Sequence, residues 1–116
     1  MMLAEKIAAR TLELAGDVDP RQQKLIETLS TGTAAMLQSR LRTDAGEADG
    51  LLVTAGSLYA LADYLETEGA SAARRFTVGD VTVEPRDTAR SAQELRLLAE
   101  RMTGHLRRSG FQFRGV

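Results

Sequence analysis

The chain has 116 residues, of which 43% are hydrophobic and 27% are charged, with a net charge of −1. This length predicts one domain over residues 1–116 with a single core, and the hydrophobic share excludes wholesale disorder. Cysteine is absent and His105 is the only histidine, which excludes disulfide frameworks, thiolate metal sites and histidine-rich metal clusters. No apolar run approaches the ~20 residues of a transmembrane helix, and no signal-peptide pattern is present, so we expect a soluble intracellular protein.

Two helices are expected in the N-terminal part, over about 2–15 and 20–42. The first has a stripe of apolar residues and ends before Gly16, a usual position for a left-handed glycine. The second follows a turn in which Asp19 can cap the helix and Pro20 fits its first position. Gly32 costs about 1 kcal/mol relative to alanine in a helix interior. It therefore marks either a kink or the close approach of another backbone, and we favour close packing.

The third helix is expected over about 48–68. Further apolar residues beside its main stripe make it apolar around more than one face, which is typical of a central helix in a bundle. Small residues such as Gly56 would let neighbouring helices approach. The main stripe has heptad-like spacing and consists of Leu51, Ala55, Leu58, Ala62 and Leu65.

A β-hairpin is expected over about 75–84, where the apolar period changes to two. The strands contain Phe76 and Val78, then Val81 and Val83, and the pair Gly79-Asp80 between them indicates a two-residue turn. A lone hairpin is marginal in water, so it must pack on something. We favour packing on its own helical bundle; the alternative is that it projects and contacts a neighbouring chain.

A fourth helix is expected over about 88–108, beginning near Asp87 or Thr88, and Ser91 with Glu94 forms a second possible capping box. We expect His105 near its end to cap the helix or face solvent, not to bind a ligand. The C-terminal tail, 109–116, again alternates apolar and polar residues, and we expect a neighbouring subunit or partner to hold it, with its own domain as the alternative. The helix has one apolar face, made of Ala92, Leu95, Ala99, Met102 and Leu106.

The charges are distributed unevenly along the chain. Residues 1–70 carry six lysines and arginines against eleven acidic residues, whereas 71–116 carry nine arginines against five acidic residues. This split is either scatter on a solvated surface or complementarity between neighbouring copies, and head-to-tail contacts of that kind build rings or filaments. Nucleic-acid binding is a third interpretation, but the overall acidity and the absence of basic and aromatic residues in alternation disfavour it.

No catalytic signature is present. The glycines do not match a phosphate-binding loop, and His105 has no obvious acidic partner for a Ser-His-Asp set. The acidic segment 44–49 is too short for a calcium loop. We therefore expect no enzyme activity, no cofactor and no metal.

The order of elements resembles that of the small head–tail connector proteins, also called head-completion or portal-adaptor proteins, of tailed bacteriophages and prophages. The likeness is carried by the hairpin segment 76–83, the patterned helix 88–108 and the tail 111–116. Those proteins are short and mostly α-helical, with a small hairpin late in the chain. The resemblance implies a ring of identical subunits docked on the portal, with the C-terminal region reaching toward it.

We thus expect a mostly α fold, a small bundle of about four helices with one β-hairpin before the last helix. The expected function is that of a structural virion protein located in the virion or host cytoplasm, with portal and tail-side proteins as partners and no membrane or direct nucleic-acid contact. The alternative is a bacterial adaptor or regulatory module that binds protein or nucleic acid through the arginine-rich last helix. The candidate interface residues are Phe76, Val78, Val81, Val83, Arg107, Arg108, Phe111, Phe113, Arg114 and Val116.

Overall fold

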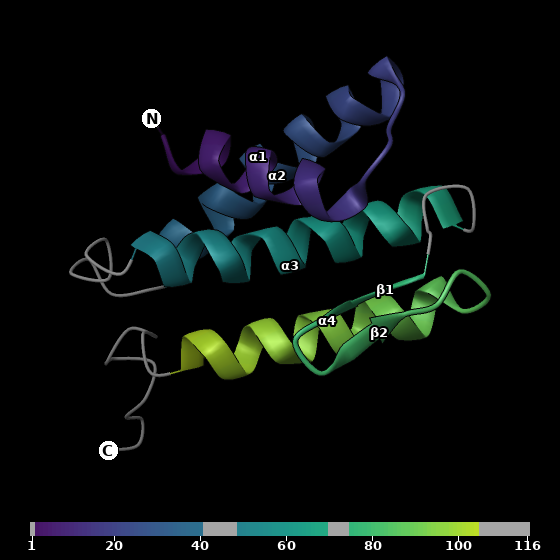
Figure 1. Cartoon of the computed structure of the whole chain (residues 1–116). Coiled ribbons are helices and arrows are strands. Elements are labelled where there is room, and N and C mark those ends of the chain that lie inside the picture. Colours follow the sequence, from purple (N-terminus) through teal and green to yellow (C-terminus); the bar gives the residue numbers. More distant parts are fainter. Residues whose placement is uncertain (1, 41–48, 70–74, 105–116) are drawn as a thin grey trace.

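A computed structural model of the chain describes residues 2–40, 49–69 and 75–104. The described residues form a small, mostly α-helical fold with an antiparallel hairpin before the last helix, which confirms the predicted fold class (Figure 1). The elements in chain order are α1 (Leu3–Ala15), α2 (Pro20–Arg40), α3 (Asp49–Glu68), β1 (Phe76–Val78), β2 (Val81–Val83) and α4 (Thr88–Thr103).

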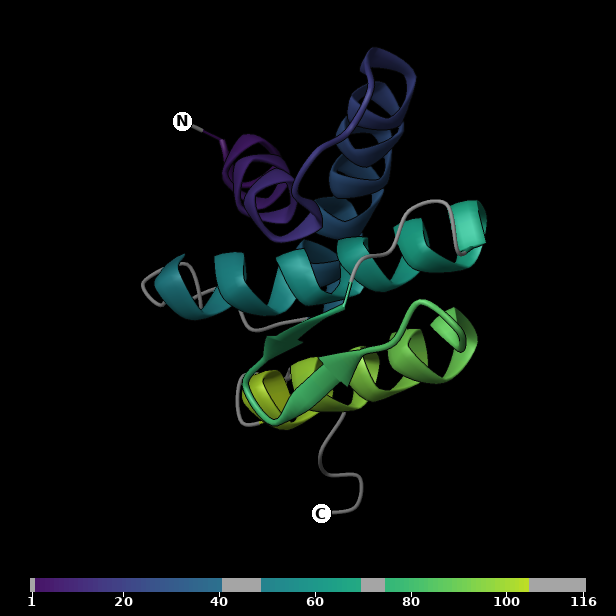
Figure 2. The ribbon, with the colours of Figure 1, turned by 45° about the vertical axis from the view of Figure 1, so that its right-hand side comes forward.

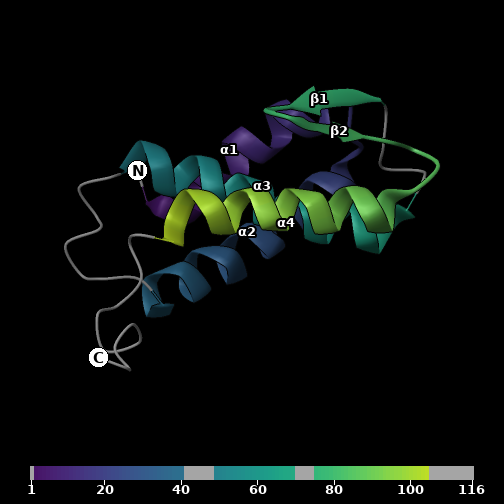
Figure 3. The same ribbon diagram turned by 90° about the horizontal axis from the view of Figure 1, so that it is seen from below.

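Helix α3 is the middle layer of the structure. It packs against α1 and α2 on one side and against α4 on the other, and the hairpin rests on α4 through β2 (Figures 1 and 2). The view from below shows α4 lying along α3 with the hairpin beside it (Figure 3). Every residue of α3 from 55 to 62 is buried. The prediction that the third helix is central is therefore confirmed.

The N-terminal helix boundaries follow from local chemistry, as the sequence predicts. The carboxylate of Asp19 accepts the backbone N–H of Gln22 at 2.7 Å, and the Gln22 side-chain oxygen accepts the Asp19 N–H at 3.1 Å. This reciprocal pair satisfies two of the free N–H groups at the start of α2, and Pro20 occupies the first helical position. Gly16 has φ 82° directly after α1, and its N–H donates to the carbonyl of Leu12.

The hairpin has the register Phe76↔Val83, Thr77↔Thr82 and Val78↔Val81. Gly79 has φ 61°, and Asp80 does not have a positive φ, as in a type II′ turn. The side chains of Val81 and Val83 are only 6% and 0% exposed and belong to the hydrophobic core of the chain. The hairpin thus packs on its own bundle, which was the favoured prediction.

Two local predictions are wrong. A Cβ built on Gly32 would meet nothing within 4 Å, so this glycine marks no close approach of another backbone. A close approach, by a side chain, occurs instead at Gly56 in α3, where a Cβ would lie 2.8 Å from Cγ1 of Ile7 and closer still to its Cδ1. Ser91 is not a capping residue either, because α4 begins at Thr88 and Asp87 accepts the N–H of Arg90.

Parts of other predictions lie outside the described residues. These are the last two residues of the second predicted helix, the end of the fourth predicted helix from residue 105 onward, and the tail 109–116. On the described part of α4, the predicted apolar face is confirmed, since Ala92, Leu95 and Ala99 are fully buried.

Candidate interaction surface

An ion-pair cluster joins α4 to α3. The Arg96 guanidinium contacts Asp63 and lies 2.7 Å from Oε1 of Glu66. The hydrogen bond from Arg96 lowers the pKa of Glu66, and the two carboxylates together raise the pKa of Arg96. One turn further along, the Tyr59 hydroxyl donates to Glu100 at 2.6 Å. Part of the charge split in the sequence is thus satisfied within one chain, because Arg96 pairs with carboxylates of the acidic half.

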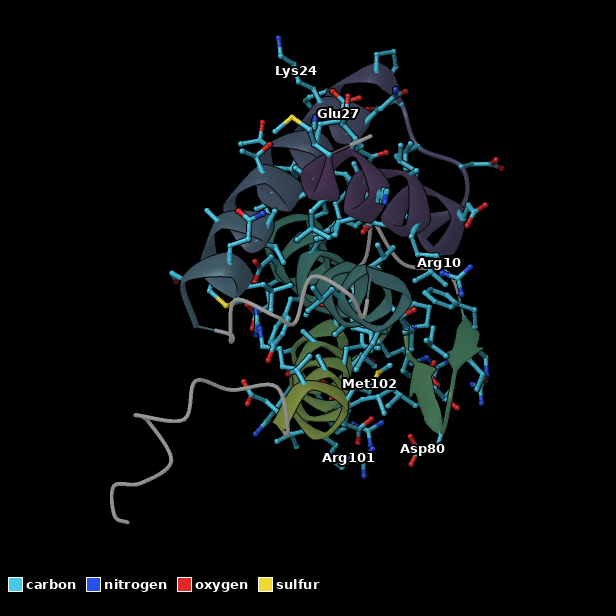
Figure 4. All side chains as sticks on the ribbon, turned by 90° about the vertical axis from the view of Figure 1, so that its left-hand side faces the viewer. Arg10, Lys24, Glu27, Asp80, Arg101 and Met102 are labelled. Carbon is cyan, nitrogen blue, oxygen red and sulfur yellow. The ribbon has the colours of Figure 1, made fainter. Side chains whose placement is uncertain are left out.

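The other arginines of the described part of α4 are also paired. Arg90 lies 3.5 Å from Asp87 and 3.8 Å from Glu94. Arg101 lies 3.5 Å from Asp80 in the hairpin turn, and Figure 4 shows the two side chains close together. A phosphate backbone is bound by cations that are available to it. Each of the three arginines in the described part of α4 therefore already has a carboxylate partner.

A shallow groove of about 460 Å³ runs between the hairpin turn and the exposed side of α4. Its centre is apolar because Leu97 lies there with 57% of its surface exposed, and Leu97 and Met2 are the large hydrophobic residues most exposed in the described part of the chain. Isolated surface leucines are common, but here the leucine is framed by charged side chains in a concave surface. The groove is lined by Asp80, Val81, Glu94, Leu97, Glu100 and Arg101.

The candidate residues of the hairpin lie next to this groove but are mostly engaged in their own domain. Val81 and Val83 are buried in the core, and Phe76 and Val78 are half-buried against it. These side chains attach the hairpin to the core, and of the four only Val81 also lines the groove. The remaining candidates, Arg107, Arg108, Phe111, Phe113, Arg114 and Val116, lie outside the described residues.

Leu97 itself was not among the predicted interface residues, although a signal for it exists. At 100° per residue, it falls almost opposite Leu95 on the helix and so lies off the apolar face of α4. An apolar residue on the polar face of an amphipathic helix is the pattern that would have identified it.

A second ion pair ties α2 to the end of α3. Arg21 donates to both oxygens of Glu68, at 2.6 and 3.1 Å, and the amide of Gln22 donates to the same carboxylate at 3.2 Å. These hydrogen bonds lower the pKa of Glu68. Burial, and then the nearby Glu68 charge, raise the pKa of Tyr64. These contacts join the start of α2 to the end of α3. The groove on α4 lies on the opposite side of α3 from α2.

Within residues 2–40, 49–69 and 75–104, no three or more His, Asp or Glu side chains are grouped so that they could hold a metal ion. None of the helices in that described part is both long and apolar enough to cross a membrane.

Comparison with known proteins adds no relative. No family model matches the chain, and neither the curated proteins nor the solved structures contain a significant match. The functional argument therefore rests on the residues and surfaces of this chain.

Proposed function

We propose that the chain is a structural virion protein, a ring-forming head–tail connector that docks on the portal during assembly of a phage or prophage particle. The observation that carries the proposal is the groove between α4 and the hairpin, where Leu97 is exposed in a charged frame. An apolar centre with a polar rim is the composition of a protein–protein contact. The proposal assigns the protein to the virion or host cytoplasm and gives it no catalytic role and no cofactor.

Two further features support this proposal. The order of elements, with a small hairpin directly before the last helix, is the order that resembles the connector proteins. The groove is also formed by elements that already pack on each other, because β2 packs on α4 with Val83 fully buried, and Asp80 lies 3.5 Å from Arg101. A preformed surface loses less conformational entropy on binding than a flexible one.

The substitution Leu97→Asp tests the role of this surface. We expect it to abolish docking on the portal and to leave thermal unfolding nearly unchanged, since exposed substitutions change stability by within about 0.5 kcal/mol. The conservative variant Leu97→Met is the matched control and should dock normally. Docking can be followed by co-sedimentation with the portal protein, whose gene the proposal expects beside this one. Normal docking of the Leu97→Asp variant would remove the groove from the proposal.

The gene neighbourhood tests the function itself. Portal, capsid and tail genes next to this one are expected, and their absence would contradict the proposal. Tight binding of DNA at moderate salt would instead favour the alternative, a regulatory module. The pairing of Arg90, Arg96 and Arg101 with carboxylates speaks against the nucleic-acid-binding version of that alternative for the described part of α4.

A further inference from the structure

A second groove, of about 450 Å³, lies between α1 and α2 on the opposite side of α3 from α4. Its apolar lining consists of alanines and Leu12 of α1, which we call its floor, and two glutamates, Glu5 and Glu27, also line it. The residues that line it are Ala4, Glu5, Ala8, Ala9, Leu12, Glu27 and Thr31.

The two glutamates of this groove have no cationic partner among the described residues. Glu5 accepts the backbone N–H of Met2 at 2.9 Å, and Glu27 accepts the Gln23 amide at 3.4 Å. In the groove on α4, by contrast, Asp80 and Glu94 are paired with arginines. The α1–α2 groove therefore combines apolar lining residues with two carboxylates that form no ion pair with a described residue.

The chain carries a segment with the complementary composition. Residues 75–104 contain five arginines and five acidic residues, so this part is neutral. Residues 105–116 contain three arginines and His105 and no acidic residue. The positive excess of the C-terminal half is thus concentrated in this last segment, together with four large apolar residues, Leu106, Phe111, Phe113 and Val116.

We propose that residues 105–116 of one copy occupy the α1–α2 groove of the next copy. In this contact Phe111 and Phe113 cover the alanine floor, and the arginines lie near Glu5 and Glu27. The inference rests on the proposed ring function, for which it names the subunit contact.

The arrangement of the layers makes this contact head-to-tail. The end of α4 and the α1–α2 groove lie on opposite sides of α3, and Figure 4 shows Glu27 and Arg101 at opposite ends of the molecule. A contact between two different surfaces, repeated from copy to copy, builds a ring when its rotation closes. Twelve fully extended residues span at most about 40 Å, close to the longest extent of the protein, 44 Å, so the segment is long enough to extend well beyond its own copy.

The test measures binding of a fluorescent peptide of residues 105–116 to the full chain by fluorescence anisotropy. The receptor carries Phe111→Ser and Phe113→Ser, so that its own segment does not compete. A groove variant adds Ala9→Arg and Glu27→Lys, both at exposed positions. A control variant with the same charge change adds Ala89→Arg and Asp17→Lys, which are exposed and outside the groove. We expect the groove variant to bind at least about 10-fold more weakly than the control, and binding to weaken as salt rises.

A second measurement distinguishes a contact between copies from one within a copy. The Phe111→Ser/Phe113→Ser variant has an intact α1–α2 groove but an altered C-terminal segment. The Ala9→Arg/Glu27→Lys variant has the intact segment but an altered groove. We expect a mixture of the two to form 1:1 dimers in analytical ultracentrifugation, whereas each variant alone stays monomeric.

Equal peptide binding by the groove and control variants, or no binding at all, would overturn the inference. A mixture that stays monomeric would overturn it too, and would place the segment in the groove of its own chain if the peptide binds. Rings formed by the Ala9→Arg/Glu27→Lys variant alone would overturn the inference and leave the connector function intact. A wild-type chain that fails to dock on the portal, while the peptide still binds and the variants still pair, would instead overturn the connector function.

Discussion

Helices α1 and α4, which pack on opposite sides of α3, are held by different kinds of contact. Toward α1, the backbone at Gly56 lies directly against the side chain of Ile7, which leaves no room for a side chain at position 56. Toward α4, the apolar contacts of Leu95 and its neighbours are bordered by charged hydrogen bonds, from Arg96 to Asp63 and Glu66 and from Tyr59 to Glu100. The α1 contact is therefore positioned by shape, whereas the α4 contact is positioned by shape together with directed polar pairs; α2, on the same side as α1, has one such pair, from Arg21 to Glu68. Substitutions that are chemically alike should then have unlike effects on the two sides.

The largest effects should come from truncating the core on either side. Ile7 and Leu95 are both fully buried, and we expect Ile7→Ala and Leu95→Ala each to lower the free energy of unfolding by about 2–5 kcal/mol. Because α3 shares its core with both layers, each variant should show one unfolding transition by circular dichroism. Two separate transitions in either variant would mean that the layers unfold independently and would break the comparison.

The two interior helix glycines provide a matched pair for the shape-determined side. We expect Gly56→Ala to destabilise the protein by about 1–2 kcal/mol, since overpacking against Ile7 outweighs the gain in helix propensity. Gly32→Ala, whose Cβ meets open space, should stabilise by about 0.5–1 kcal/mol. Denaturant titrations measure both values. Combining Gly56→Ala with Ile7→Val, which removes the nearest atom, should recover part of the loss, and stabilisation by Gly56→Ala alone would contradict the close approach.

Two fully buried serines form a second matched pair. The Ser91 hydroxyl accepts the backbone N–H of Glu84 at 2.8 Å and so anchors the end of β2 to α4. Ser91→Ala should cost about 1–3 kcal/mol because it leaves that buried N–H without a partner. The Ser30 hydroxyl on α2 is buried and has no hydrogen-bond partner among the described residues, so Ser30→Ala should stabilise by about 1 kcal/mol. Thermal melts of the two variants should move in opposite directions, and shifts of the same sign would refute this pair.

The smallest effect concerns the charged border. Arg96→Gln should cost about 1 kcal/mol at neutral pH, the upper range for partly exposed pairs. Glu66 and Glu68 have pKa values below their ordinary 4.5 because Arg96 and Arg21 donate to them. Their contribution to stability is therefore present above about pH 4.5 and is lost as the pH falls through the lowered pKa values. Denaturation at pH 7, 4.5 and 3 should show this loss, and Arg96→Gln should reduce it. If the pH dependence of stability is the same in that variant as in the wild-type chain, the pairing of Arg96 with Glu66 contributes nothing to stability.

Much of the fold was predictable because it is encoded in short stretches of chain. The apolar spacing of 51–65, the Asp19-Pro20 pair and the Gly79-Asp80 turn each dictate local backbone geometry through interactions a few residues apart. The central position of α3 also followed from its own composition, since a helix that is apolar on several faces must be covered on several faces.

The tertiary structure alone decided which faces meet. The sequence shows a glycine in the interior of each of two helices, but the close approach is at Gly56 and not at Gly32, because a Cβ at Gly32 would meet nothing whereas one at Gly56 would meet Ile7 of another helix. It shows basic and acidic halves, but only the packing of α4 on α3 joins Arg96 to Asp63 and Glu66. The candidate surfaces were also decided by the tertiary structure alone. The exposure of Leu97 and the groove between α1 and α2 depend on how helices distant in sequence pack, and local patterns do not specify this.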